Sequence, residues 1–313
     1  MESVAIGLAT CRRSDLLRKS LLSLNEIIVP EELRVEIFIA DNDSMPSNQE
    51  TVDEIANNIK FPISYFHFNK PGIPNVRNFL LKIAAESYVD ALLFIDDDEE
   101  VDKFWLVSMW NYYSMNRGNV VALEGPVLAK FTDQVPPWIP VDLYSSDRKL
   151  TTGTPRHVAK TGNLMLSMDF IRETGLRFDE RMAFTGGSDT EFTWRITKNG
   201  GSIRWCSEAI VYENVNKGRL TVSWLVKRHF RYGTSDAMFW KLNHSRIYST
   251  FWIMRRSFWN LLKSSVGFIF SGLNSSGYVK YYVMAYKSFG LIFGLIGYSY
   301  NEYDPKRYRK KTL

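Results

Sequence analysis

Short apolar runs that each end in a cluster of polar residues are the feature that most constrains the fold of this chain. The runs lie at residues 4–9, 35–40 and 91–95, and apolar residues at helical spacing occur at 14–24 and 75–88. Strands that alternate with amphipathic helices are typical of an α/β fold with a doubly wound, mostly parallel sheet. Ligands of such sheets bind beyond the carboxyl ends of the strands, where all three polar clusters fall. We therefore expect a Rossmann-like core with a binding site at that edge.

The acidic cluster after the third run is the strongest candidate for chemistry. Asp96, Asp97 and Asp98 follow the apolar run directly, and two glutamates extend the cluster. Like charges held close together raise the free energy unless a cation neutralises them. Mg²⁺ and Mn²⁺ take carboxylate oxygens and often share them with substrate phosphates. The alternative is an acidic helix N-terminus, but a cap needs one carboxylate rather than a row of them. The cluster therefore predicts a site for Mg²⁺ or Mn²⁺.

Three other polar residues suit a ligand, and each has a simpler structural interpretation. Asp41 ends the second run and can accept hydrogen bonds from a nucleobase or ribose, or form an Asx-turn. Asp189 follows a glycine-rich loop at the start of a helix predicted at 189–199, where it is either a general base or an N-cap. Arg77 lies in the first turns of the 75–88 helix, and it either holds a phosphate or a carboxylate of the site or is solvated.

Missing motifs remove several other classes of protein. The four histidines are scattered and form no HExxH motif, which argues against zinc. No GxGxxG follows the first run, and no GxxxxGK[ST] or GxSxG occurs. A nucleotidyltransferase remains an alternative because it also combines an α/β core with paired carboxylates. That class usually carries a glycine-rich basic loop after the first strand, where this chain has Thr-Cys-Arg-Arg at 10–13.

Charge divides the chain into an acidic front and a basic back. Residues 217–313 hold 17 lysines and arginines against 3 acidic residues, a balance of +14, which leaves −9 for residues 1–216 in a chain of net charge +5. We expect a catalytic domain at 1–216 and a basic, helical, aromatic-rich region at 217–313 that binds anionic lipid or nucleic acid. Its aromatic residues lie in apolar helical runs, which favours lipid over a nucleic-acid-binding module. The tail at 306–311 adds a basic run.

The same region predicts helices at a membrane surface. Its longest charge-free stretches, 264–279 and 288–301, are shorter than the ~20 apolar residues of a spanning helix. We therefore expect interfacial or buried helices, with a spanning hairpin as the alternative. Residues 1–10 predict a strand rather than a signal peptide. The expected location is cytoplasmic and peripheral, on the inner face of the plasma membrane.

In combination, the motifs resemble glycosyltransferase family 2, and more closely its succinoglycan-type branch of exopolysaccharide transferases. The resemblance covers roughly residues 3–240 and rests on the order of seven motifs rather than on any one. They are, in chain order, Thr10-Cys11-Arg12-Arg13, Asp41-Asn42, Gly72 with Arg77-Asn78, Phe94-Ile95-Asp96-Asp97-Asp98-Glu99, Pro136-Pro137-Trp138, Thr161-Gly162-Asn163 and Gly186-Gly187-Ser188-Asp189-Thr190-Glu191-Phe192. The resemblance implies a GT-A fold and transfer of a sugar from a nucleoside-diphosphate sugar.

The resemblance also implies a role for each matched residue. Asp189 would be the catalytic base that takes the proton of the acceptor hydroxyl as its oxygen attacks the anomeric carbon. Asp98 would be the direct ligand of Mg²⁺ or Mn²⁺, which neutralises the leaving diphosphate. One displacement inverts the anomeric carbon, so an α-linked donor would give a β-linked product. The residues that would bind the donor nucleotide are Thr10, Arg12, Asp41, Arg77 and Asp96.

Five further residues are candidates, namely Trp138, Asn163, Glu191, Arg228 and Arg231. The family usually has Glu-Asp where this chain has Ser188-Asp189, and Glu191 either compensates for the missing carboxylate or is structural. Trp138 either stacks on an acceptor sugar or packs in the core. The two arginines either reach the diphosphate or form a basic surface facing the membrane. The expected partners are a nucleoside-diphosphate sugar, with UDP-sugars first, a glycan or lipid-linked acceptor and an anionic membrane surface, but no nucleic acid.

Overall fold

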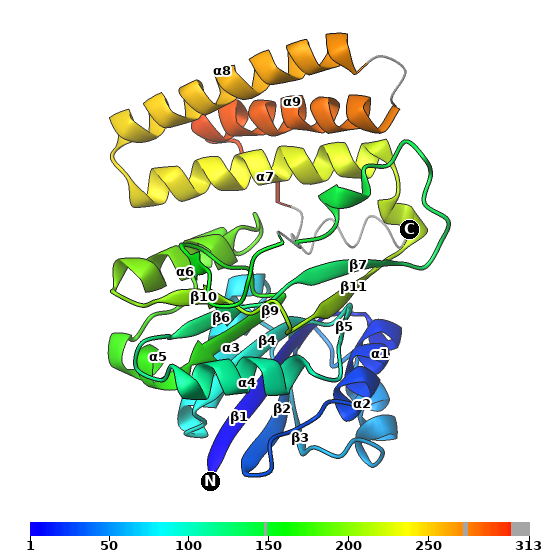
Figure 1. Cartoon of the computed structure of the whole chain (residues 1–313), viewed down its shortest axis with the longest axis vertical. Helices are drawn as coiled ribbons and strands as arrows, with labels where there is room; N and C mark the ends of the chain where they lie inside the picture. The colour runs from blue at the N-terminus through cyan, green and yellow to red at the C-terminus, as the bar shows by residue number, and fades with distance from the viewer. Residues whose placement is uncertain (147–148, 272–274, 302–313) are drawn as a thin grey trace. The chain divides into compact units, whose positions relative to one another are not determined.

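The computed structural model describes residues 1–146, 149–271 and 275–301 and divides the chain into two compact units (Figure 1). The first unit holds Met1–Lys130, Ser145–Arg181 and Ser188–Asn214. The second holds Phe131–Tyr144, Met182–Gly187 and the residues from Val215 on. The basic run predicted at 306–311 lies outside the described residues.

An eight-stranded sheet, in the order β3-β2-β1-β4-β9-β6-β10-β8, forms the centre of the first unit. Its strands are β1 (Glu2–Thr10), β2 (Leu33–Asp41), β3 (Ile63–His67), β4 (Ala91–Asp96), β6 (Ala122–Glu124), β8 (Pro155–Arg156), β9 (Asn163–Ser167) and β10 (Ile203–Trp205). The strands β3, β2, β1 and β4 are parallel neighbours, and β6 and β10 run the same way, whereas β9 and β8 run against them. The prediction of an α/β fold with a doubly wound, mostly parallel sheet is confirmed.

Helices cover both faces of this sheet (Figure 1). One face packs against α1 (Ser14–Asn25), α2 (Gln49–Ala56) and α4 (Trp105–Met115), and the other against α3 (Ile73–Glu86), α5 (Met168–Thr174) and α6 (Ser188–Lys198). Successive strand residues point to opposite faces, so Ile37 and Ile39 enter the first core while Phe38 and Ala40 enter the second. The central strands are buried on both faces, which explains why they are continuous apolar runs in the sequence.

A second, three-stranded sheet contains β5 (Glu99–Val101), the strand that directly follows the three aspartates of the acidic cluster. It has the order β5-β11-β7, with β11 (Val211–Val215) and β7 (Val127–Phe131). The backbone N–H of Asn214 in β11 donates to the carbonyl of Asp98 at 3.0 Å. The acidic turn therefore connects β4, in the first sheet, to β5, in the second. Each strand is hydrogen-bonded within its own sheet, so both ends of the turn are fixed.

The second unit contains the long helices α7 (Val222–Asn243), α8 (Arg246–Phe270) and α9 (Ser275–Leu295). The helix α9 packs against both α7 and α8, and glycines bring α7 and α9 close together. A Cβ atom on Gly233 would lie 2.1 Å from the carbonyl oxygen of Lys287, and one on Gly290 would lie 2.1 Å from that of Phe230. The helical, aromatic-rich C-terminal region is confirmed. Among the described residues, no helix combines the length and the apolar character needed to cross a membrane.

A partly buried histidine in α7, His229, makes the second unit sensitive to acid. Desolvation, together with the nearby cations Arg228 and Lys287, lowers the pKa of His229 to about 4, although a hydrogen bond to the Leu225 carbonyl opposes the shift. The unfolded state, with a histidine pKa near 6.5, then binds more protons than the folded state between about pH 4 and pH 6.5. His229 therefore lowers stability as the pH falls through this window, by on the order of 1 kcal/mol between pH 7.5 and 5.5.

Replacement of His229 by glutamine should remove this part of the acid sensitivity. We expect the difference between urea unfolding midpoints at pH 7.5 and pH 5.5 to be smaller in the variant than in the wild type. Equal differences in the two proteins would show that His229 titrates normally.

Candidate active site

The carboxyl ends of β1, β2 and β4 bring the predicted donor-binding residues together. In the parallel register Thr10 is opposite Asp41, and Ala9 is opposite Asp96. Residues separated by more than 80 positions in the sequence thus lie on adjacent strands. The sheet edge predicted to bind a ligand is therefore the one where these polar side chains meet.

Two side chains from the end of β1 bind the acidic cluster. The Thr10 hydroxyl donates to Asp97 at 2.8 Å, and the Arg13 guanidinium contacts Asp97 at 2.9 Å and Asp98 at 3.4 Å. Burial raises the pKa of the Asp97 carboxyl to about 6, an effect that Arg13 opposes and Asp98 reinforces. Arg13 was not among the predicted site residues, although it belongs to the Thr-Cys-Arg-Arg motif. Its basic side chain, three residues after the strand that neighbours β4, is the signal that could have identified it.

Asp41 is fully buried and has one carboxylate oxygen with no protein partner. Its Oδ2 accepts hydrogen bonds from the Asn48 backbone at 2.8 Å, the Asn48 amide at 3.1 Å and the Tyr65 hydroxyl at 2.6 Å. Its Oδ1 is buried and accepts none. An unsatisfied buried acceptor costs about 1–3 kcal/mol, and more when it is charged. The orientation of Asp41 is therefore fixed through one oxygen, and the other is left without a hydrogen-bond partner in the protein.

Arg12 forms a bidentate ion pair with Asp43 in the turn after β2. Its Nε lies 2.6 Å and its Nη2 2.7 Å from the two carboxylate oxygens. This pairing lowers the pKa of the Asp43 carboxyl. The Arg12 backbone has a φ of 55°, a left-handed conformation that is uncommon for a residue with a side chain. The structure thus holds Arg12 at the predicted site edge, where it neutralises a second carboxylate.

The start of α3 is anchored to the same edge. The Asn42 amide donates to the carbonyls of Phe68 and Lys70 and accepts from the N–H of Gly72, which precedes α3 with a φ of 115°. Arg77 in the first turns of α3 contacts the Asp96 carboxylate at 3.1 Å. From the sequence, Arg77 either bound a phosphate or a carboxylate of the site or was solvated. The contact with Asp96 agrees with the first of these alternatives.

The acidic turn offers donor atoms that fit a divalent cation. Asp98 is buried, whereas 46% of the Asp96 side chain is exposed, and both present hard carboxylate oxygens. Within the described parts of the chain, no three acidic, histidine or cysteine side chains form a complete metal centre. Mg²⁺ commonly binds through one or two carboxylates together with substrate phosphates. The residues therefore fit a cation shared with a diphosphate, and Asp98 with Asp96 would hold it.

Glu99 supports this turn from within the core. Its Oε2 accepts the backbone N–H of Asp96 at 2.7 Å, and burial together with the nearby Asp96 raises its pKa well above the ordinary value for a glutamate. A Cβ on Gly162 would lie 2.6 Å from its Oε1. The glycine of the Thr161-Gly162-Asn163 motif is thus needed because a carboxyl group packs against its backbone.

Asp189 lies at the start of α6, in the first unit. Its Oδ1 accepts the backbone N–H of Thr190 at 2.9 Å, and its side chain is partly exposed. The preceding Ser188 is buried. A partly exposed carboxylate at a helix N-terminus is accessible to a substrate hydroxyl, as a general base must be.

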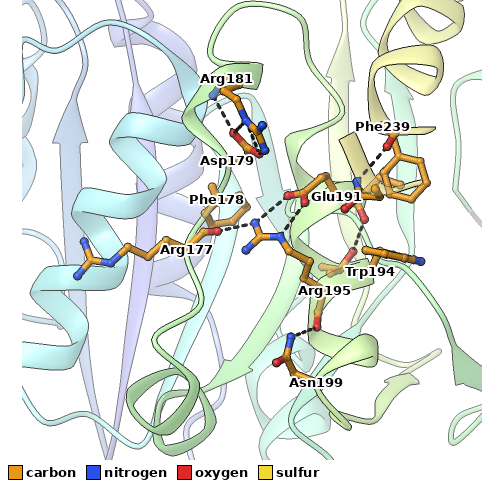
Figure 2. A network of polar contacts seen from close by, with 12 residues as sticks. Arg177, Phe178, Asp179, Arg181, Glu191, Trp194, Arg195, Asn199 and Phe239 are labelled. Carbon is orange, nitrogen blue, oxygen red and sulfur yellow. Dashed lines mark hydrogen bonds and ion pairs between the residues drawn. The ribbon is translucent and has the colours of Figure 1, made fainter. Parts of the chain in front are cut away.

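Glu191, two residues further along α6, forms a buried ion pair with Arg195 (Figure 2). Both carboxylate oxygens lie 2.7 Å from the guanidinium of Arg195, which also donates to the carbonyl of Arg177 at 2.6 Å. Only 2% of the Glu191 side chain is exposed. The structure therefore places Glu191 in a structural ion pair rather than beside Asp189 as a replacement for the missing carboxylate.

The remaining candidates lie in the core or in the second unit. The buried amide of Asn163 accepts from the Trp105 indole and donates to the carbonyls of Pro126 and Ala209, so it joins three segments of the core. Trp138, Arg228 and Arg231 belong to the second unit. The Arg228 guanidinium lies 4.8 Å from the Trp224 ring centre and donates to the Tyr232 hydroxyl. Contact of these residues with a diphosphate or an acceptor stays a prediction.

The fold and its acidic sheet edge are those of the GT-A class, and comparison with known sequences specifies the family. The profile described as "Glycosyl transferase family 2" matches residues 5–173. The chain is 33% identical over 230 residues to the succinoglycan biosynthesis protein ExoM of Rhizobium meliloti (strain 1021), which covers 74% of this chain and 72% of that protein. The chain belongs to glycosyltransferase family 2, and the resemblance to its exopolysaccharide branch is confirmed.

Solved structures share this fold. Residues 1–349 of S. aureus TarS in complex with UDP superpose with a TM-score of 0.52 at 16% identity, covering 96% of this chain and 93% of that one. GalNAc-T7 with UDP, GalNAc and Mn²⁺ gives a TM-score of 0.54 at 14% identity, covering 76% of this chain and 51% of that one. This chain spans 55% of a longer TarS chain. At these identities the likeness establishes a common fold.

Proposed function

We propose that this glycosyltransferase is a metal-dependent, inverting enzyme that moves a sugar from a nucleoside-diphosphate sugar, with UDP-sugars first, to a lipid-linked or surface-polysaccharide acceptor. The observation that carries the proposal is the buried, unpaired Oδ1 of Asp41 at the end of β2, which β1 separates from β4 and its acidic cluster. A nucleobase N–H would satisfy that oxygen, and the diphosphate would then extend toward the carboxylates. TarS with UDP and GalNAc-T7 with UDP and Mn²⁺ support the choice of donor and cofactor.

In the proposed reaction, each residue of the site has its own role. Asp41 orients the base, Thr10 and Arg13 hold the Asp97 carboxylate, and Arg77 holds Asp96. A bound Mg²⁺ or Mn²⁺ would neutralise the charge that develops on the leaving diphosphate. Asp189 takes the proton of the acceptor hydroxyl as the C–O bond to the anomeric carbon forms and the bond to the diphosphate breaks. Attack from the opposite side of the sugar inverts its configuration.

The experiment that tests this function is hydrolysis of a panel of UDP-, GDP- and TDP-sugars with Mn²⁺ or Mg²⁺. We expect metal-dependent release of the nucleoside diphosphate from one donor by the wild type and loss of that release in Asp98→Ala. Asp53→Asn, which changes an exposed carboxylate on α2, should behave as the wild type. An absence of turnover together with an absence of metal-dependent nucleotide binding would contradict the proposal.

Asp41→Asn should weaken binding of the nucleotide while preserving the fold. The asparagine oxygen can accept the bonds from Asn48 and Tyr65, but its NH₂ group then faces the base as a donor. Loss of a hydrogen bond to a charged group costs about 1.5–3 kcal/mol, so we expect a roughly 10- to 100-fold higher Kd for the nucleoside diphosphate by calorimetry. Tyr65→Phe is the control, because it removes a bond to the other oxygen. An unchanged Kd for the nucleoside diphosphate in Asp41→Asn would show that the nucleobase does not bind at Asp41.

We also propose that residues 1–216 form the catalytic domain and that residues 217–313 keep the enzyme on the cytoplasmic face of the plasma membrane. The support is the +14 charge balance of the C-terminal residues, because each basic residue near an anionic surface contributes about 1 kcal/mol of binding. The proposal assigns no nucleic-acid partner to this region, since its aromatic residues lie in apolar helical runs.

A further inference from the structure

The helix α8 buries mainly small residues and exposes most of its large apolar ones. The residues that it buries are Ser249, Ile253, Ser257, Ser264 and Gly267. Its exposed side chains include an apolar stripe in which residues recur every three or four positions, namely Ile247, Phe251, Met254, Phe258, Leu262, Val266 and Ile269. Residues at this spacing share one face of a helix. The arrangement is the reverse of that in a helix that packs its apolar face on a soluble core.

Basic residues surround this stripe, and no acidic residue occurs between 246 and 270. A recess of about 310 Å³ on the helix is lined by Trp252, Arg255, Arg256, Trp259, Asn260 and Lys263. Guanidinium and ammonium groups bind phosphate oxygens, and tryptophan favours the boundary between acyl chains and headgroups. The recess thus combines phosphate-binding cations with two side chains suited to that boundary.

We propose that α8 lies in the plane of an anionic bilayer surface, with the apolar stripe among the acyl chains and the recess holding lipid phosphates. This inference rests on the membrane-surface part of the proposed function and names the element responsible. A basic amphipathic helix with an exposed apolar face is the pattern of interfacial binding. A second copy of the chain on this face would bring cations of like charge together, and a nucleic acid would leave the apolar stripe in water.

The test is flotation of the full chain with vesicles. We expect binding to vesicles of phosphatidylglycerol and phosphatidylcholine and little binding to phosphatidylcholine alone. Charge reversal by Arg255→Glu, Arg256→Glu and Lys263→Glu together should lower the partition coefficient at least about 100-fold. The matched control reverses three exposed lysines of the first unit, Lys19, Lys82 and Lys103, and should bind as the wild type.

A second variant tests insertion separately from charge. Phe251→Ser with Phe258→Ser should weaken vesicle binding and reduce quenching of tryptophan fluorescence by brominated acyl chains. Wild-type binding by either α8 variant would overturn the inference. So would binding of RNA in place of vesicles, or a lipid-free dimer that the phenylalanine substitutions dissociate.

Donor hydrolysis without vesicles is measured on every variant, and retained turnover shows that the variant is folded. Loss of vesicle binding with turnover retained supports the inference. A chain that binds vesicles through α8 but hydrolyses no nucleotide sugar would support the inference and overturn the proposed donor chemistry.

Discussion

Replacement of Asp189 by asparagine is expected to lower the rate of sugar transfer by about 10²–10⁴-fold, which is the usual contribution of a positioned general base. Asparagine is nearly the same size as aspartate and its oxygen can still accept the N–H of Thr190, so α6 should keep its start. It cannot take the proton of the acceptor hydroxyl. We expect the loss in kcat, with the Kd of the nucleoside diphosphate unchanged.

Glu180→Gln provides the matched control for this substitution. Glu180 is an exposed carboxylate nine residues earlier in the chain, and it pairs with Lys70 at 2.5 Å. Its replacement removes the same charge and should leave transfer unchanged. If Asp189→Asn kept more than a tenth of the wild-type rate, another residue would have to be the base.

Glu191→Ala is expected to destabilise the first unit by about 3 kcal/mol, because removal of one partner leaves the other charge of a buried pair uncompensated. The Arg195 side chain is 26% exposed, so water recovers part of the loss. The measurement is chemical denaturation followed by circular dichroism, with donor hydrolysis measured under native conditions, where we expect little change.

The double variant Glu191→Leu with Arg195→Leu separates charge from packing. Replacement of a buried pair by apolar residues of similar volume is often neutral, so the double variant should be more stable than Glu191→Ala. A large loss of sugar transfer in Glu191→Ala with unchanged stability would contradict a structural role for Glu191. It would instead make Glu191 part of the catalytic site.

The sequence predicted the sheet well because its strands are buried on both faces. The runs at 4–9, 35–40 and 91–95 correspond to β1, β2 and β4 with boundaries that differ by no more than two residues. The three-residue strands β5, β6 and β10 are too short to show a period. They form because β11, β9 and β6 supply backbone partners, and those contacts arise only in the folded chain.

The polar contacts of the site were less predictable than its position. Strands that end in acidic residues indicated the sheet edge at which these side chains meet, but the pairing of Arg12 with Asp43 and of Arg13 with Asp97 spans 31 and 84 residues. The role of Glu191 was present in the sequence as a glutamate four residues before an arginine on a helix, a spacing that favours an ion pair. The buried amide of Asn163 joins three segments of the core, and no sequence pattern predicts such contacts.

The fixed orientation of the Asp41 carboxylate has a consequence for which nucleobases the proposed donor site would accept. Hydrogen bonds from Asn48 and Tyr65 to Oδ2 fix the carboxylate before a nucleotide arrives, so binding of a base there would cost little conformational entropy at this residue. In the proposed function, the other oxygen would select among bases by the protonation of their ring nitrogens. Uracil, thymine and guanine present a ring N–H to such an acceptor, whereas cytosine presents a lone pair and would be repelled.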